Sequence, residues 1–402
     1  MEDHRLVQVA QIKAARQLLA GVVRPTPAVR SDSLSRHCGR PVWLKPEQLQ
    51  RTGSFKIRGA YTMLSELPAG SAVVAASAGN HAQGVALAAS MLGMRATIFM
   101  PADVSLPKLQ ATEAYGAEVR LDGEVVDDAI AAAREHAVAS GAVFVPPFDD
   151  PRIIAGQGTI GLELLDEVPD LQAVAVVIGG GGLCSGISAA VKQVAPAVRT
   201  VGVMASGAAS MADSIAAGYP VAVQPRTIAD GIALRSPSAL TMAHVEAFVD
   251  DLVAVSDDAI ARALLLLAER AKAVVEPAGS ASMAAALDGL VPGDGPVAVV
   301  LSGGNIDALL LAKLLEFGLT ASGRFLRLGI VVPDRPGSLA ALTSFVAGQR
   351  LNVVDVEHHR TGLRLPVGGV EVVMTVETRD REHQEAVVAA LRDAGYTVQT
   401  HD

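Results

Sequence analysis

From Trp43 to about Leu315, short runs rich in β-branched residues alternate with longer stretches rich in alanine and leucine. The runs are Ala72–Ala76, Ala96–Met100, Ala142–Val145, Ala173–Ile178, Thr200–Val203 and Pro296–Leu301. Because they do not alternate apolar with polar residues, they are typical of strands that are covered on both faces. The repeated order of strand and helix predicts an α/β fold with mostly parallel sheets.

A different pattern follows the small polar stretch Thr320–Gly323. It predicts four strands and two helices in the order β-α-β-β-α-β, at Phe325–Val332, Ser338–Gln349, Asn352–His359, Val370–Thr378, Arg381–Ala394 and Thr397–Thr400. This order is the ferredoxin-like unit. We therefore expect a first domain over residues 1–321, with a smaller subdomain over roughly residues 50–150, and a second domain over residues 325–402.

The composition excludes several classes of partner. A net charge of −9 over 402 residues, without a run of lysine and arginine, argues against nucleic acid and acidic membranes. The longest uncharged stretch, Leu171–Val191, contains four consecutive glycines, and the N-terminus has no apolar signal sequence. We therefore expect no membrane span and a cytoplasmic protein. Cys38 and Cys184 show no metal-ligand spacing and are expected to be reduced thiols.

Lys56 lies within Ser54–Tyr61, between two apolar neighbours and close to two glycines. Burial disfavours the ammonium form, so a lysine in this setting has more neutral amine with which to form a Schiff base. Pyridoxal phosphate is the obvious aldehyde. The alternative is a lysine whose stem packs on Phe55 while its ammonium group stays in water.

The polar segment Ser77–Gly84 comes directly after the run Ala72–Ala76 and opens a helical stretch. Free backbone amides at a helix start, with the side chains of Ser77 and Asn80, are suited to hold a carboxylate. The alternative is an ordinary N-cap, for which serine and asparagine are preferred in any case.

Four glycines followed by a leucine, Gly179–Leu183, join the run Ala173–Ile178 to another helical stretch. Successive amides without side chains can surround a phosphate, and the helix dipole adds positive potential. A flexible linker is the alternative reading. The pattern is neither a Walker loop nor a dinucleotide fingerprint.

A third turn, Ser302–Asn305, follows the run Pro296–Leu301. The Ser302 hydroxyl is suited to hydrogen-bond a neutral ring nitrogen, which would make the ring a weaker electron sink than a protonated pyridine. That favours loss of a β-substituent over transamination. Alone, this segment cannot be distinguished from a common turn.

Together, Thr52–Lys56 and these three turns resemble the threonine dehydratases, also called threonine ammonia-lyases, of pyridoxal-phosphate fold type II, which is tryptophan synthase β-like. The similarity extends to Pro147–Pro151, Ala155–Thr159 and Ala229–Ala233, so it covers most of residues 20–315. The resemblance implies two parallel-sheet subdomains and pyridoxal 5'-phosphate as cofactor.

The resemblance also implies a role for individual residues. The cofactor would be bound covalently by Lys56, flanked by Phe55, approached at its 3-hydroxyl by Asn80, held at its phosphate by Gly179, Gly180, Gly181, Gly182 and Leu183, and hydrogen-bonded at its ring nitrogen by Ser302. The substrate carboxylate would be bound by Ser77, Gly79, Asn80 and His81.

The implied reaction converts L-threonine into 2-oxobutanoate and ammonia, with conversion of serine into pyruvate as a side activity. The alternatives are a serine dehydratase or racemase of the same fold and a non-catalytic amino-acid sensor. Related racemases have a second serine where this chain has Ala78, whose methyl group cannot transfer a proton. Met204 and Ser210 stand where such racemases hold a cation, so no metal site is expected; the effect of Gln48, where many relatives have asparagine, stays open.

The tail resembles an ACT domain, with Asp334–Leu339 as its first turn. Gly337, Ser338 and Leu339 would approach an amino-acid effector, and Asn352 would bind its amino group. Isoleucine or valine is the effector suggested by analogy with branched-chain amino-acid synthesis. A dimerisation module with an empty pocket is the alternative. A homo-oligomer, a dimer or a tetramer, is expected.

Overall fold

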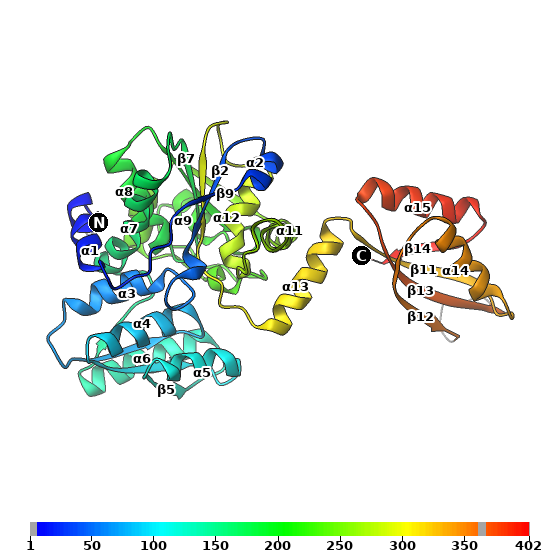
Figure 1. The fold of residues 1–402 in the computed structure, drawn as a ribbon. Coiled ribbons are helices and arrows are strands. Elements are labelled where there is room, and N and C mark those ends of the chain that lie inside the picture. The colour runs from blue at the N-terminus through cyan, green and yellow to red at the C-terminus, as the bar shows by residue number, and fades with distance from the viewer. Residues whose placement is uncertain (1–5, 361–366, 402) are drawn as a thin grey trace. The chain divides into compact units, whose positions relative to one another are not determined.

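The computed structural model describes residues 6–360 and 367–401. The chain forms two compact units, Met1–Leu311 and Ala312–Asp402 (Figure 1). The division falls within helix α13 (Ala308–Ala321). The domain limits expected from the sequence, at residues 321 and 325, therefore stay a prediction.

A six-stranded sheet forms the centre of the first unit (Figure 1). Its strands, in spatial order, are β1 (Val29–Arg30), β2 (Val42–Pro46), β10 (Val297–Leu301), β7 (Ala173–Val177), β8 (Arg199–Ala205) and β9 (Asp251–Val255). All neighbours are parallel except β1, which runs antiparallel to β2. Every residue of β7 and β10 is buried, which explains why these runs are continuously apolar.

A second, wholly parallel sheet of four strands lies in the same unit. Its order is β5 (Glu118–Leu121), β4 (Arg95–Met100), β3 (Ala72–Ala76) and β6 (Val143–Phe144). The predicted α/β architecture with two parallel-sheet parts is confirmed, and five of the six predicted runs match their strands to within about one residue at each end. The sixth, Thr200–Val203, lies inside the longer β8.

Helices connect the parallel strands. In the first unit they are α1 (Val9–Leu18), α2 (Asp32–Cys38), α3 (Lys56–Ser65), α4 (Asn80–Met91), α5 (Leu106–Ala114), α6 (Val126–Ser140), α7 (Pro151–Glu167), α8 (Gly182–Val194), α9 (Ser210–Ala217), α10 (Ala239–Phe248), α11 (Asp257–Leu266) and α12 (Pro277–Leu287). Residues at the helix ends determine where these helices begin and end. Helix α7, for example, begins after Asp150, whose carboxylate accepts from the Arg152 amide, and has proline at its first position.

Glycines let helices α3, α7 and α8 approach one another at backbone distance. A Cβ atom at Gly156 of α7 would lie 2.6 Å from the carbonyl oxygen of Arg58, and one at Gly186 of α8 would lie 2.3 Å from that of Ile154. A larger residue at either position would push the helices apart. The three helices therefore form one tightly packed block.

The second unit is a four-stranded antiparallel sheet in the order β12 (Val353–His359), β13 (Gly369–Glu377), β11 (Phe325–Pro333) and β14 (Thr397–His401). Helices α14 (Ser338–Gly348) and α15 (Arg381–Asp393) belong to the same unit (Figure 1). Leu328, Ile330 and Leu342 are among the residues of its apolar core. The predicted β-α-β-β-α-β order is confirmed.

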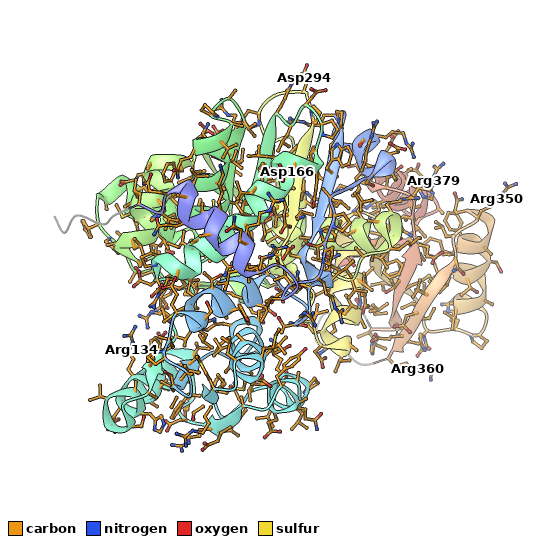
Figure 2. All side chains as sticks on the ribbon, turned by 60° about the vertical axis from the view of Figure 1, so that its left-hand side comes forward. Arg134, Asp166, Asp294, Arg350, Arg360 and Arg379 are labelled. Atoms are coloured by element: carbon orange, nitrogen blue, oxygen red, sulfur yellow. The ribbon has the colours of Figure 1, made fainter. Side chains whose placement is uncertain are left out.

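Charged side chains such as Arg134, Asp166 and Asp294 project outward from the first unit (Figure 2). Among residues 6–360 and 367–401, no helix is long and apolar enough to cross a membrane. Both cysteines are free thiols, and the described residues include no group of three or more histidine, cysteine or acidic side chains placed to bind a metal ion.

Candidate active site

Segments that are far apart in the sequence meet at the start of helix α3. The Phe55 amide donates to the Ser302 carbonyl at 3.2 Å, and the Gly304 amide donates to the Gly53 carbonyl at 2.9 Å. Ser302 directly follows β10, which lies between β2 and β7 in the large sheet. The structure thus brings two of the four predicted segments, Thr52–Lys56 and Ser302–Asn305, into direct contact.

Asparagine side chains connect the third predicted segment to these two. The Asn305 amide nitrogen donates to the Thr52 carbonyl at 2.6 Å and to Asn80 Oδ1 at 2.8 Å. Asn80 is the first residue of α4, directly after the β3 turn. The β3 and β10 turns therefore meet beside the start of α3, although they lie in different sheets.

Lys56 is the first residue of α3, and its Nζ donates to the carbonyl oxygen of Pro147 at 3.0 Å. Burial lowers the pKa of this amine from its usual 10.5 to about 8, although the nearby carboxylate of Glu276 opposes the shift. The same nitrogen lies 5.2 Å from the centre of the Phe55 ring. Near neutral pH, Lys56 thus has much more neutral amine than an exposed lysine.

The glycine loop between β7 and α8 is packed against the chain that holds Lys56 in place. A Cβ atom at Gly180 would lie 2.3 Å from the Phe148 ring, and one at Gly182 would lie 2.8 Å from Phe148 Cβ. Phe148 adjoins Pro147, the acceptor for Lys56. Within the described residues, the amides of Gly179, Gly180 and Gly181 have no acceptor. The loop can therefore offer amides at the start of a helix of 13 residues.

The Ser77 turn offers backbone amides more than side chains. The Gly79 amide donates to Ser77 Oγ at 3.1 Å, whereas no acceptor for the Asn80 or His81 amide lies among the described residues. His81 Nε2 hydrogen-bonds the Val145 carbonyl at 2.9 Å, so this ring nitrogen already has a partner in the protein. Burial and the charge of Lys56 lower the pKa of His81 to about 3, and the ring is neutral.

Glu276 is a site residue that the sequence did not single out. It is 5% exposed, and its Oε1 accepts a hydrogen bond from Asn80 Nδ2 at 2.7 Å. Burial and the charge of Asp230 raise its pKa to about 7, against the Asn80 hydrogen bond and the charges of Lys108 and Lys56. The only signal in the sequence was glutamate before proline at a helix start, which an ordinary N-cap region also has.

The second unit contains the predicted effector residues at the turn between β11 and α14. Gly337 and Leu339 are exposed there, and Ser338 is half-buried. The Asn352 side-chain amide donates to the Glu377 carboxylate at 3.1 Å. The turn is therefore open, but Asn352, one of the four predicted effector-binding residues, already has a hydrogen-bond partner.

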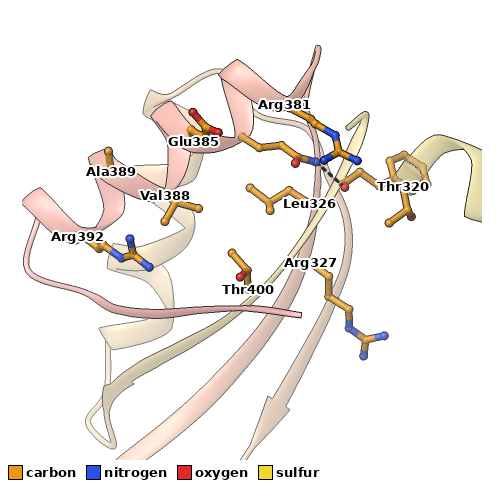
Figure 3. Close-up of a pocket in the computed structure, with 11 residues that line it drawn as sticks. Thr320, Leu326, Arg327, Arg381, Glu385, Val388, Ala389, Arg392 and Thr400 are labelled. Carbon is orange, nitrogen blue, oxygen red and sulfur yellow. Dashed lines mark hydrogen bonds between the residues drawn. The ribbon is translucent and has the colours of Figure 1, made fainter. Parts of the chain in front are cut away.

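A cavity of about 420 Å³ lies elsewhere in the second unit, between α15, β11 and β14 (Figure 3). Leu326 and Val388 are apolar side chains in its wall, whereas Arg381, Arg392 and Glu385 carry charge at its edge. None of the predicted effector residues lines it.

Comparison with known families supports this geometry. The family described as "Pyridoxal-phosphate dependent enzyme" matches residues 19–303, and the family "ACT domain" matches residues 326–395. The chain belongs to the first of these families, and the second matches only its C-terminal part. An "L-threonine ammonia-lyase" of Thermotoga maritima is 44% identical over 397 residues, which are 98% of this chain and 99% of the relative.

Two solved structures resemble more than three quarters of this chain. The processed form of threonine deaminase isoform 2 from Solanum lycopersicum is 35% identical, with a TM-score of 0.73 over 78% of this chain and 95% of the other. Maize serine racemase is 33% identical, with a TM-score of 0.74 over 79% and 99%. The resemblance to threonine ammonia-lyases of fold type II is confirmed.

The residues present fit pyridoxal phosphate. A buried amine, an aromatic ring beside it and a loop of unbonded amides match the aldehyde, ring and phosphate of that group. Two buried hydroxyls next to Lys56, those of Thr52 and Ser54, have no partner among the described residues. Because buried polar groups are nearly always hydrogen-bonded, these two hydroxyls are free to bind the polar groups of a cofactor.

Proposed function

We propose that this enzyme removes water from L-threonine and releases 2-oxobutanoate and ammonia, with serine as a slower substrate that gives pyruvate. The observation that carries the proposal is the Lys56 amine, with its pKa near 8, where three strand-to-helix turns meet. The reaction of the Thermotoga maritima relative, as its name gives it, supports the same choice.

When bound, pyridoxal phosphate supplies an electron-withdrawing ring that acidifies the Cα–H bond of an attached amino acid. Lys56 would hold the cofactor and then, once displaced by the substrate's amino group, accept the Cα proton at its neutral Nζ. The β-hydroxyl takes up one proton, which balances the proton removed from Cα, and leaves as water. Hydrolysis of the released 2-aminocrotonate consumes one water and gives the 2-oxo acid and ammonia.

The other predicted residues would bind and orient. The amides of Gly179, Gly180, Gly181, Gly182 and Leu183 would hold the phosphate, Phe55 would pack on the ring, Asn80 would face its hydroxyl, and Ser302 would bind the ring nitrogen. The substrate carboxylate would bind at Ser77, Gly79, Asn80 and the backbone of His81, whose ring is already bonded to Val145.

The test compares the purified protein with Lys56→Ala. We expect 2-oxobutanoate from L-threonine, a lower kcat/KM for serine, and borohydride reduction that fixes the cofactor on the peptide containing Lys56. Lys56→Ala should show neither labelling nor turnover. Retained turnover, or labelling of another lysine, would refute the assignment.

A serine racemase is the second candidate, because maize serine racemase shares the fold at 33% identity. Ala78, in the turn after β3, has only a methyl group where the resemblance places a proton donor for the opposite face of Cα. Chiral analysis of the serine that is left after partial turnover of L-serine separates the two candidates. A racemase forms D-serine from L-serine, and a lyase does not. Tight binding of isoleucine without any turnover would instead indicate an amino-acid sensor.

The ACT unit would regulate the reaction by binding an amino acid at the Gly337–Leu339 turn and Asn352. Such an effector must bind two states of the protein with different affinities, and the substrate must then change the effector's affinity by the same factor. Initial rates measured against threonine, with and without isoleucine or valine, test this. Light scattering tests the expected homo-oligomer, a dimer or a tetramer, and the expected compartment is the cytoplasm.

A further inference from the structure

A cluster of buried charges lies beside the helix that begins at Lys56. We name it the Arg58 cluster; it consists of Thr26, Lys45, Glu47, Arg58, Thr159, Glu163 and Glu167. The side chains of Arg58, Glu47 and Lys45 are 1%, 0% and 0% exposed. In the part of the chain that the structure describes, the hydrogen bonds and ion pairs of these three side chains all stay within the cluster.

Arg58 is the centre of the cluster and binds two carboxylates at once. Its Nε and Nη2 donate to Glu47 at 2.9 and 2.8 Å, and its Nη1 and Nη2 donate to Glu163 at 2.6 and 3.0 Å. The Thr159 hydroxyl accepts a further bond from Nη1 at 3.0 Å. Paired, planar contacts of this kind fix the direction of the side chain as well as its charge.

The two carboxylates come from different parts of the first unit. Glu47 follows β2 of the large sheet, whereas Glu163 lies on α7, and Arg58 is the third residue of α3. The Arg58 fork therefore ties the first turn of α3 to the sheet and to α7 together. The close packing of α3 against α7 also restrains this turn. A Cβ atom at Gly156 of α7 would lie only 2.6 Å from the Arg58 carbonyl oxygen.

Stability alone does not account for these charges. Removing charges from water is costly, and well-packed apolar residues of similar volume commonly give equal or greater stability. The cluster adds directional contacts to the packing of α3, since Arg58 binds two carboxylates in fixed directions. Lys56 is the first residue of that helix, two residues before Arg58.

We propose that Arg58 is a positioning residue for the reaction: by clamping Glu47 and Glu163, it holds the first turn of α3 so that Lys56 Nζ reaches the cofactor and the Cα proton. This inference rests on the function proposed above. It predicts that loss of the clamp lowers the rate of the chemical step and of cofactor capture more than it lowers substrate affinity, because a shift of about 1 Å in a reacting group can cost about 100-fold in rate.

The test compares Arg58→Met with Lys45→Met. Lys45 is an equally buried cation that also binds Glu163, at 2.8 Å, but it lies on β2 rather than on α3. Both variants should unfold at lower urea concentration than the wild type. Only Arg58→Met should show a fall of roughly 100-fold in kcat with KM little changed, and slower capture of added pyridoxal phosphate by the apo-protein.

A folded Arg58→Met variant with normal kcat and normal capture would overturn the proposal, and so would an equal loss in Lys45→Met. If Arg58→Met does not fold, Arg58→Lys replaces it, because lysine keeps the charge but cannot bind two carboxylates in a plane. We expect Arg58→Lys to lose at least about tenfold in kcat and in capture rate. Wild-type values in Arg58→Lys would likewise overturn the proposal. The capture measurement needs no turnover, so it separates failure of this inference from failure of the proposed reaction.

Discussion

Two glycines in different units have nearly the same backbone conformation and precede a helix in the same way. Gly181, before α8, has φ 96° and ψ −14°, and Gly337, before α14, has φ 92° and ψ −14°. Their surroundings differ. A Cβ atom at Gly181 would lie 2.8 Å from both Met211 and Thr241, whereas one at Gly337 would meet nothing within 4 Å.

The difference shows that local conformation alone does not make a binding site. Both turns present amides at a helix start, and both were assigned to ligands from the sequence. Amides in a buried turn interact with a ligand in a medium of low dielectric constant, whereas amides in an open turn already bind water. We therefore expect tight binding at the Gly181 turn and weak, conditional binding at the Gly337 turn.

The largest effect is expected for Gly181→Ala. The left-handed backbone costs an alanine about 1–2 kcal/mol, and the crowded Cβ adds about 1–3 kcal/mol, so the apo-protein should lose about 2–5 kcal/mol in its free energy of unfolding. Capture of pyridoxal phosphate should fail as well. Urea unfolding and cofactor titration measure the two quantities. Wild-type stability and affinity in this variant would remove the distinction between the two turns.

The second largest effect is expected in the pH dependence of cofactor capture by Lys56 at the buried site. Because the Lys56 pKa is lowered to about 8, the neutral amine predominates above pH 8 and is lost as the pH falls below it. Capture of pyridoxal phosphate by the apo-protein should therefore be constant above about pH 8 and fall about tenfold per pH unit below it. Stopped-flow absorbance from pH 6 to 10 measures the rate. A rate that still rises about tenfold per pH unit up to pH 10 would show that the amine is solvated like an exposed lysine.

A smaller effect is expected for Gly337→Ala, the matched change at the open turn. Only the backbone cost of about 1–2 kcal/mol applies, because the new methyl group has no neighbour. The loss should be confined to unfolding of the second unit, with kcat for threonine unchanged when no effector is present. Differential scanning calorimetry resolves the unit affected. A loss as large as that of Gly181→Ala would mean that the open turn is packed in solution.

The smallest change in stability is expected for Asn352→Ala. Its bond to Glu377 is exposed, so the free energy of unfolding should change by less than about 0.5 kcal/mol. Any response of the initial rate to isoleucine or valine should nevertheless disappear. Arg392→Ala, at the separate cavity of Figure 3, is the control and should retain that response. The reverse pattern would move the effector site to the cavity.

Much of the fold could be predicted because burial on both faces leaves a direct mark on the sequence. The run Ala72–Ala76 coincides with β3, and the six elements of the second unit follow the predicted order. The short strand β1 escaped prediction because two exposed residues at an edge carry no such mark. The Arg58 cluster escaped too, since the two carboxylates that bind Arg58 lie 11 and 105 residues from it in the sequence and each charged residue resembles ordinary surface charge.

The sequence by itself determined the family and predicted the strand-to-helix turns and a reactive lysine, because apolar periodicity, glycine runs and helix-start residues act over a few neighbouring positions. Only the tertiary structure decided that Asn80 binds Glu276, that His81 binds the Val145 carbonyl, and that Arg58 bridges Glu47 and Glu163. These contacts depend on which distant groups are buried together, and no local pattern encodes that.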